Sequence, residues 1–165
     1  MLRLMSTTVL AMGIATGALA QSVGLDHIGA NADAPKQLLF EPHVGYSNSS
    51  GNEGNAAAFQ AAYEVFAAAH PDFYIEIQGH TGQDTEVQKL IDLAFSGDGA
   101  ECVILDSFRV PFFKNLGILK DLSPYFSQEE KDDLFPFVSN TVSGPNGELF
   151  AWWFNTDVRM LYRRT

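Results

Sequence analysis

Runs of hydrophobic residues with two different periods alternate along the first two thirds of the chain. Residues 38–44 and 73–78 are short, β-rich runs, which predict two strands. Between them, aromatic residues recur at positions i, i+4 and i+7 among alanines, which favour helix. This spacing predicts an α-helix that is capped by Asn55, ends before His70-Pro71 and turns three aromatic side chains toward the core: Phe59, Tyr63 and Phe66.

A second helical stripe follows the second strand. Thr85 and Gln88 have the spacing of a capping box, and Gly97 is placed to end the helix. Residues 102–105 (CVIL) are apolar at every position, which is typical of a parallel strand covered on both faces and would bury Cys102. The stripe on the helix has a period close to 3.6 and comprises Val87, Leu90, Ile91, Ala94 and Phe95.

The order strand–helix–strand–helix–strand, with short connections, predicts an α/β fold with a parallel sheet and right-handed crossovers. Beyond it, Pro111 opens a short helix that ends near Gly117. Ser127 and Glu130 form a capping box for an acidic helix that runs to about residue 135. Asn146-Gly147 marks a turn, and residues 148–154 and 158–163 are β-like runs.

Composition narrows the classes of function. The chain has 165 residues and a net charge of −10, from 20 acidic against 10 basic side chains, which argues against nucleic-acid binding. A single cysteine excludes an internal disulfide framework and a cysteine-rich zinc site. The four histidines have no metal-ligand spacing, and no phosphate-binding loop or nucleophile elbow occurs, so no cofactor is expected.

The first 20 residues have the pattern of a cleavable secretory signal peptide. Arg3 precedes an apolar, charge-free stretch from Val9 to Ala18, and Ala18-Leu19-Ala20 has the form of an A-x-A cleavage site. No cysteine follows this site, so a lipid anchor is not indicated. We therefore expect export to the periplasm and a mature chain that starts at Gln21.

From residue 38 onward, an ordered series of motifs resembles the extracellular solute-binding receptors (family 1 type) of ABC importers, in the group that mostly binds sugars. His70-Pro71-Asp72 and the following IEIQ resemble the family's N-P-[DN] break and short strand. Residues 90–99 (LIDLAFSGDG) and 101–106 (ECVILD) resemble L-x-x-A-x-A-S-G-D and P-D-[VI]-[VI]-x-x-D, although Ala100 and Glu101 replace the usual Pro-Asp. The series continues in order through residues 111–122, Phe135-Pro136, GELFA, WWFNTD and LYR.

The resemblance implies a periplasmic binding protein-like α/β lobe with a mainly parallel sheet flanked by helices. Family members are well over twice as long and close two lobes around a ligand, so the second lobe is expected to be largely missing. The implied organisation is a signal peptide (1–20), a loose segment (21–36), a solute-binding lobe (37–150) and a hinge stub (151–165). The implied function is capture of a sugar or oligosaccharide, without catalysis, by a monomer that delivers it to an ABC permease in the inner membrane.

Sugar recognition favours carboxylates, which accept hydrogen bonds from hydroxyl groups, and aromatic rings, which stack on the apolar faces of a pyranose. Ligands of open α/β sheets bind outside the carboxyl ends of the strands, where the residues after CVIL are expected to lie. The candidate ligand-binding residues are Asp106, Ser107, Phe108, Trp152, Trp153, Phe154, Asp157, Tyr46 and His43.

Each candidate also has a purely structural interpretation. Asp106-Ser107 is equally suited to cap a helix, and Asp157 to form a turn. Trp152 and Trp153 would point to opposite faces of a strand, so one belongs in the core and the other forms the platform. An enzyme with Asp106 and Asp157 as paired glycosidase carboxylates, or with a Ser107–His43 triad, is a weaker alternative. The remaining alternative is a truncated remnant or a one-lobed interaction module.

Overall fold

The structure is a computed structural model, and it describes residues 26–156. The expected signal peptide, Asp157 and the β-like run 158–163 lie outside the described residues. None of the helices within residues 26–156 has the length and apolar character needed to cross a membrane.

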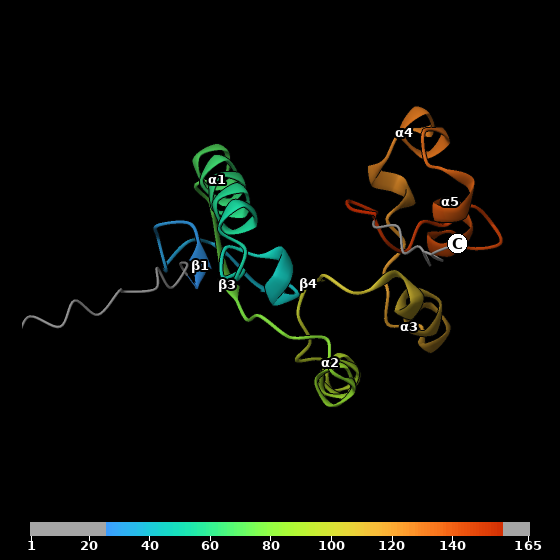
Figure 1. Cartoon of the computed structure of the whole chain (residues 1–165), viewed down its shortest axis with the longest axis horizontal. Helices are drawn as coiled ribbons and strands as arrows, with labels where there is room; N and C mark the ends of the chain where they lie inside the picture. Colours follow the sequence, from blue (N-terminus) through green and yellow to red (C-terminus); the bar gives the residue numbers. More distant parts are fainter. Residues whose placement is uncertain (1–25, 157–165) are drawn as a thin grey trace, which may run out of the picture.

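A four-stranded, mainly parallel sheet organises the first part of the described chain (Figure 1). β2 (Lys36–Glu41) lies at the centre and pairs in parallel with β3 (Phe73–Ile77) and with β4 (Cys102–Val103). The antiparallel strand β1 (His27–Ile28) pairs with the other edge of β3. The predicted α/β fold is confirmed. Residues 21–36 were expected to form a loose segment, but within it His27–Ile28 form strand β1, and the Ile28 side chain is buried.

Helix α1 (Glu53–Ala69) connects β2 to β3 and lies against the sheet (Figure 1). Its predicted aromatic face does turn toward the sheet. The rings of Tyr63 and Phe40 meet edge-on at 6.3 Å, and those of Phe66 and Phe73 at 5.8 Å. These side chains are only half-buried, and α1 has no fully buried residue. The predicted cap at Asn55 is wrong: the Asn52 side chain caps the helix and accepts the N–H of Asn55.

Helix α2 (Asp84–Ser96) connects β3 to β4 and ends, as predicted, at Gly97 with φ +87°. The capping box expected at Thr85 lies two residues earlier, since the N–H of the cap residue Gln83 donates to the Glu86 carboxylate. Val87 and Ile91 of the predicted stripe are buried, whereas Phe95 is 63% exposed.

The apolar run 102–105 is not a strand covered on both faces. Only Cys102 and Val103 pair with β2, at the edge of the sheet, and Cys102 is exposed. Leu105 instead packs against the cluster that joins α2 to the next helix. The run is therefore apolar because its second half enters a helical core, and not because a central strand passes through it.

The helices that follow, α3 to α5, lie away from the sheet (Figure 1). α3 (Val110–Leu116) begins and ends as predicted, and Ser127 and Glu130 form the predicted capping box of α4 (Gln128–Asp132). The acidic helix does not reach residue 135, because Pro136 starts a new helix, α5 (Pro136–Val142). The β-like run 148–154 forms only an isolated bridge between Ser143 and Leu149, since no described strand lies beside it.

Asp121 ties this helical part to the segment that carries the tryptophans. Its carboxylate accepts the backbone N–H of Ser123 at 2.8 Å and that of Leu149 at 3.0 Å, together with the Ser123 hydroxyl. The hydrogen bond from the Ser123 N–H, and then that from Leu149, lowers the Asp121 pKa below its ordinary 3.8. The ionised carboxylate therefore stabilises the folded chain.

We predict that Asp121→Asn lowers the free energy of unfolding at pH 7 and that its deficit shrinks at pH 3. The stabilisation is complete above the ordinary aspartate pKa of 3.8 and is lost as the pH falls through that value toward the lowered one. Urea denaturation at both pH values measures the deficit. Asp133→Asn, an exposed change at the end of α4, is the control. An equal deficit at pH 7 and pH 3 would contradict the prediction.

Candidate ligand-binding edge of the sheet

Three loops leave the parallel strands at one edge of the sheet, and each carries polar or aromatic side chains. His43 and Tyr46 follow β2, His80 follows β3, and residues 106–109 follow β4. In parallel sheets this carboxyl edge is where ligands bind. The fold therefore places five of the predicted residues, His43, Tyr46 and 106–108, on neighbouring loops although up to 65 positions separate them in the sequence.

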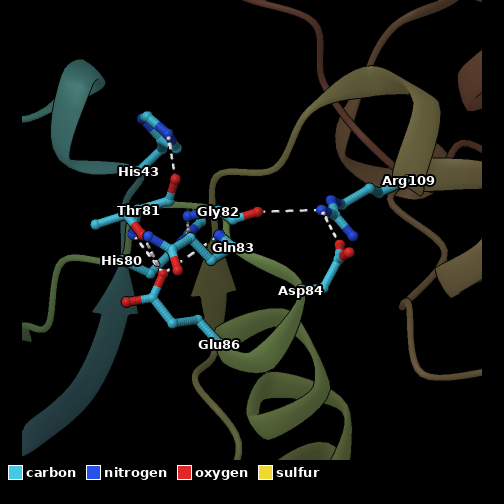
Figure 2. A network of polar contacts seen from close by, with 8 residues as sticks. All are labelled: His43, His80, Thr81, Gly82, Gln83, Asp84, Glu86 and Arg109. Atoms are coloured by element: carbon cyan, nitrogen blue, oxygen red, sulfur yellow. Dashed lines mark hydrogen bonds and ion pairs between the residues drawn. The ribbon is translucent and has the colours of Figure 1, made fainter.

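His80, which the sequence analysis did not select, holds these loops together (Figure 2). Its side chain is 6% exposed, and Nε2 lies 2.8 Å from the carbonyl of Ile104 in the β4 loop. Nδ1 accepts the backbone N–H of Gly82 at 3.1 Å. His43 forms a parallel β-bridge with His80, and its Nε2 lies 3.0 Å from the Thr81 carbonyl. The shared position of the two histidines, just after parallel strands, was the available sequence signal.

Arg109 fastens the third loop to the start of α2 (Figure 2). Its Nη2 donates to the Gly82 carbonyl at 3.0 Å and to the Asp84 carboxylate at 2.9 Å. The Thr81 N–H and hydroxyl donate to the Glu86 carboxylate, which lowers the Glu86 pKa, the hydroxyl having the larger effect. The loops after β3 and β4 are thus held by a continuous set of polar contacts.

Aromatic rings from three segments meet beside these loops. The Phe154 ring meets Tyr46 edge-on, with centroids 5.6 Å apart, and meets Phe59 at 6.4 Å. Tyr46 also contacts the His43 ring at 5.8 Å. Phe154 is 53% exposed, so the group is open to solvent. The structure therefore brings together three predicted residues, Phe154, Tyr46 and His43, although the first two are 108 positions apart in the sequence.

Residues 148–154 form no strand, so the expected alternation of the two tryptophans across a strand does not apply, yet the two side chains have different environments. Trp153 packs against the cluster of Val138, Val142 and Leu149, and its Nε1–H donates to Thr156 at 2.7 Å. Trp152 is 41% exposed and stacks on one face by Phe126, with centroids 4.2 Å apart and planes at 6°. Trp152 is therefore the one that can offer a free ring face to a ligand.

Asp106 occupies the N-cap position of a short 3₁₀ turn, residues 107–109, but its side chain makes no capping hydrogen bond. Its backbone carbonyl accepts the N–H of Arg109 instead, so the exposed carboxylate remains available to an external donor. Phe108 is 70% exposed and lies with its ring centroid 5.1 Å from the Arg109 guanidinium. Ser107 is half-buried, and Asp157 lies outside the described residues.

Glu41, at the carboxyl end of β2, is the buried acid of this edge. It is 5% exposed, and this burial raises its pKa. Within residues 26–156, no group of three or more histidine, cysteine or acidic side chains is arranged to hold a metal ion. The described edge thus offers hydrogen-bond acceptors and aromatic faces.

Comparison with known proteins gives a structural relative only. No protein-family model and no curated protein sequence matches this chain. The fold is similar to that of the galacto-N-biose/lacto-N-biose I-binding protein of the ABC transporter from Bifidobacterium longum, solved in complex with lacto-N-biose, with a TM-score of 0.50. The similarity covers 73% of this chain and 28% of that protein, at 16% sequence identity.

The α/β fold of this chain is similar to part of a periplasmic binding protein-like lobe. The sheet with its flanking helices corresponds to the α/β lobe expected from the motif series. The chain spans 28% of the length of the solved protein, and that protein is a binding protein of a transporter.

Proposed function

We propose that this chain is part of the first lobe of a periplasmic sugar-binding receptor of an ABC importer. It captures a sugar or oligosaccharide at the carboxyl edge of the sheet and, together with a second lobe, delivers it to a membrane permease. The observation that carries the proposal is the contact between Phe154 and Tyr46 at this edge. Through this contact, the Phe154 ring, near the C-terminal end of the described residues, lies beside the loops that carry Asp106 and His43.

The chemistry of the edge suits a sugar. At the edge, the exposed Asp106 carboxylate can accept hydrogen bonds from hydroxyl groups, and the exposed Phe154 ring can contact an apolar sugar face. Trp152 lies two residues before Phe154, and the ring face that Phe126 leaves uncovered can stack on a pyranose. Export by the predicted signal peptide would place this receptor in the periplasm, where we expect it to act as a monomer. Closure of the two lobes around the sugar would shift the population toward the form that the permease recognises.

The proposal is tested with the protein produced from the whole reading frame of its gene, without the signal peptide. Its thermal unfolding is followed with a panel of monosaccharides, disaccharides and oligosaccharides, including lacto-N-biose. A ligand present at 100 times its dissociation constant stabilises the folded state by about 2.7 kcal/mol. Chromatography of the sugars afterwards should recover them unchanged, whereas a glycosidase would release products. The absence of stabilisation by any member of the panel would refute the proposal.

A one-lobed interaction module is the second candidate, and exposed rings in the helical part favour it. Phe135 and Phe137 stack with centroids 5.9 Å apart and are 70% and 51% exposed. A pair of this kind is typical of a surface that another protein part covers. Sequencing the locus beyond the Thr165 codon separates the two candidates: a frame that continues through a second lobe, beside permease genes, supports the receptor.

A further inference from the structure

The hydrogen-bond partners of His43 and His80 fix the protonation state of both rings. In each ring, Nδ1 faces a backbone N–H, that of Gly45 for His43 and that of Gly82 for His80, both at 3.1 Å. A nitrogen that accepts a hydrogen bond carries no proton. In each ring, Nε2 faces a carbonyl oxygen, which can only accept, so Nε2 carries the proton. Both imidazoles are therefore neutral, with the proton on Nε2.

Together the two rings form a chain across the three loops. His43 joins the β2 loop to Thr81 of the β3 loop, and His80 joins the β3 loop to Ile104 of the β4 loop. Ile104 lies two residues before Asp106, and His43 lies three before Tyr46. The ring centroids of the two histidines are 5.7 Å apart, in an edge-to-face arrangement. Backbone hydrogen bonds from the N–H groups of Val44, His80 and Ile104 join the same loops, and the neutral rings add side-chain links to them.

A second proton on either ring is incompatible with this arrangement. It would sit on Nδ1 and point at the N–H of Gly45 or Gly82, so that a donor would face a donor. Two like charges would also stand 5.7 Å apart, where each disfavours the other. Histidine is the side chain that normally takes up this proton between pH 8 and pH 5, roughly the physiological range.

The charged groups around His80 come from each element packed against it. Glu41 of β2 is buried beside His80, and α2 contributes Glu86 and Lys89. Arg109 donates a hydrogen bond to the carbonyl of Gly82, the residue whose N–H donates to His80 Nδ1. The Thr81 N–H and hydroxyl donate hydrogen bonds to the Glu86 carboxylate. Glu41 has no partner for its buried Oε2, so it would attract the charged ring away from Gly82.

We propose that His80, with His43, is a positioning residue: the neutral pair reinforces the backbone links that hold the three loops in the binding arrangement, and protonation removes this reinforcement and weakens sugar binding. This role rests on the proposed function for its ligand. The acid-sensitive link between the loops, however, is a property of the described chain alone.

The link is tested first without any sugar. Nitrogen-15 NMR of the histidine side chains at pH 7.5 should show His43 and His80 as neutral rings protonated on Nε2. The protection factor of the Gly82 amide against hydrogen exchange should fall at least about tenfold between pH 7.5 and pH 5, the loss expected for one buried hydrogen bond. A ring protonated on Nδ1 at pH 7.5, or unchanged protection at pH 5, overturns the inference.

In a second experiment, the affinity of the protein from the whole reading frame for the strongest ligand of the panel is measured at both pH values. Wild-type affinity should fall about tenfold from pH 7.5 to pH 5, again the loss of about one buried hydrogen bond. The double variant His43→Gln with His80→Gln cannot titrate at these positions, so its affinity should be nearly independent of pH. His70→Gln, an exposed change at the end of α1, should keep the wild-type profile.

The NMR experiment and the sugar-binding experiment distinguish failure of the positioning role from failure of the proposed receptor function. If the NMR results hold and no sugar binds, the proposed function fails and the acid-sensitive link stands. If sugar binds equally well at pH 7.5 and pH 5, or if the double variant keeps the wild-type pH profile, the positioning role fails and the receptor function stands.

Discussion

Replacing Phe113 by alanine is expected to destabilise the chain by about 3–5 kcal/mol, the usual cost of removing a buried phenylalanine. Phe113 is 2% exposed and packs against Val87 and Ile91, which are also buried. These residues join α3 to α2, and four half-buried neighbours pack on them: Leu105, Leu116, Ile118 and Leu119. The cavity left by the ring would therefore open at the junction between the sheet-bearing part and the helical part.

Urea denaturation followed by circular dichroism measures this loss. Phe112→Ala is a matched control, because the neighbouring residue has the same side chain and is 54% exposed. We expect the control to lose less than about 1 kcal/mol, as is usual for surface substitutions. Similar losses in the two variants would show that the α2–α3 cluster does not hold the parts together.

The order of the central elements could be predicted from the sequence because each has a strong local signal. Periodicity located α1 and α2, and His70-Pro71 and Gly97 fixed where they end. The two-residue strand β1 has no such signal, since only its pairing with β3 defines it. The start of α5 does not follow from the sequence pattern, because Phe135-Pro136 continues the acidic stretch, whereas in the structure Pro136 is the first residue of a new helix.

The candidate site residues that directly follow strands could be predicted from the sequence. Those whose role depends on tertiary contacts could not. His43, Tyr46 and Asp106 could be placed because they follow predicted strands. Nothing local to His80 or Arg109 indicates that they bridge loops, since their partners are backbone carbonyls 24 and 27 positions away. The sequence could not tell which tryptophan packs inward, and only the contacts with Val138, Val142 and Leu149 identify it as the partly buried Trp153.

Replacing Trp152 by alanine is expected to weaken sugar binding strongly and to leave folding largely unchanged. Phe126 covers one face of its ring and the residue is 41% exposed, so the opposite face is the flat surface that a pyranose can use. Removal of a central aromatic contact typically costs about 2 kcal/mol or more of binding free energy, or about thirtyfold in the dissociation constant. We therefore expect Trp152→Ala to weaken binding of the strongest ligand at least about thirtyfold.

Isothermal titration with the protein from the whole reading frame measures this effect. Trp152→Phe keeps a flat ring and should recover most of the affinity, whereas Phe95→Ala removes a ring that is 63% exposed on α2 and should leave binding unchanged. Because Trp153 carries the core contacts of this segment, the unfolding temperature of Trp152→Ala should stay close to that of the wild type. Binding unaffected by Trp152→Ala would remove Trp152 from the site, and loss of binding in Phe95→Ala would point to a fault in folding.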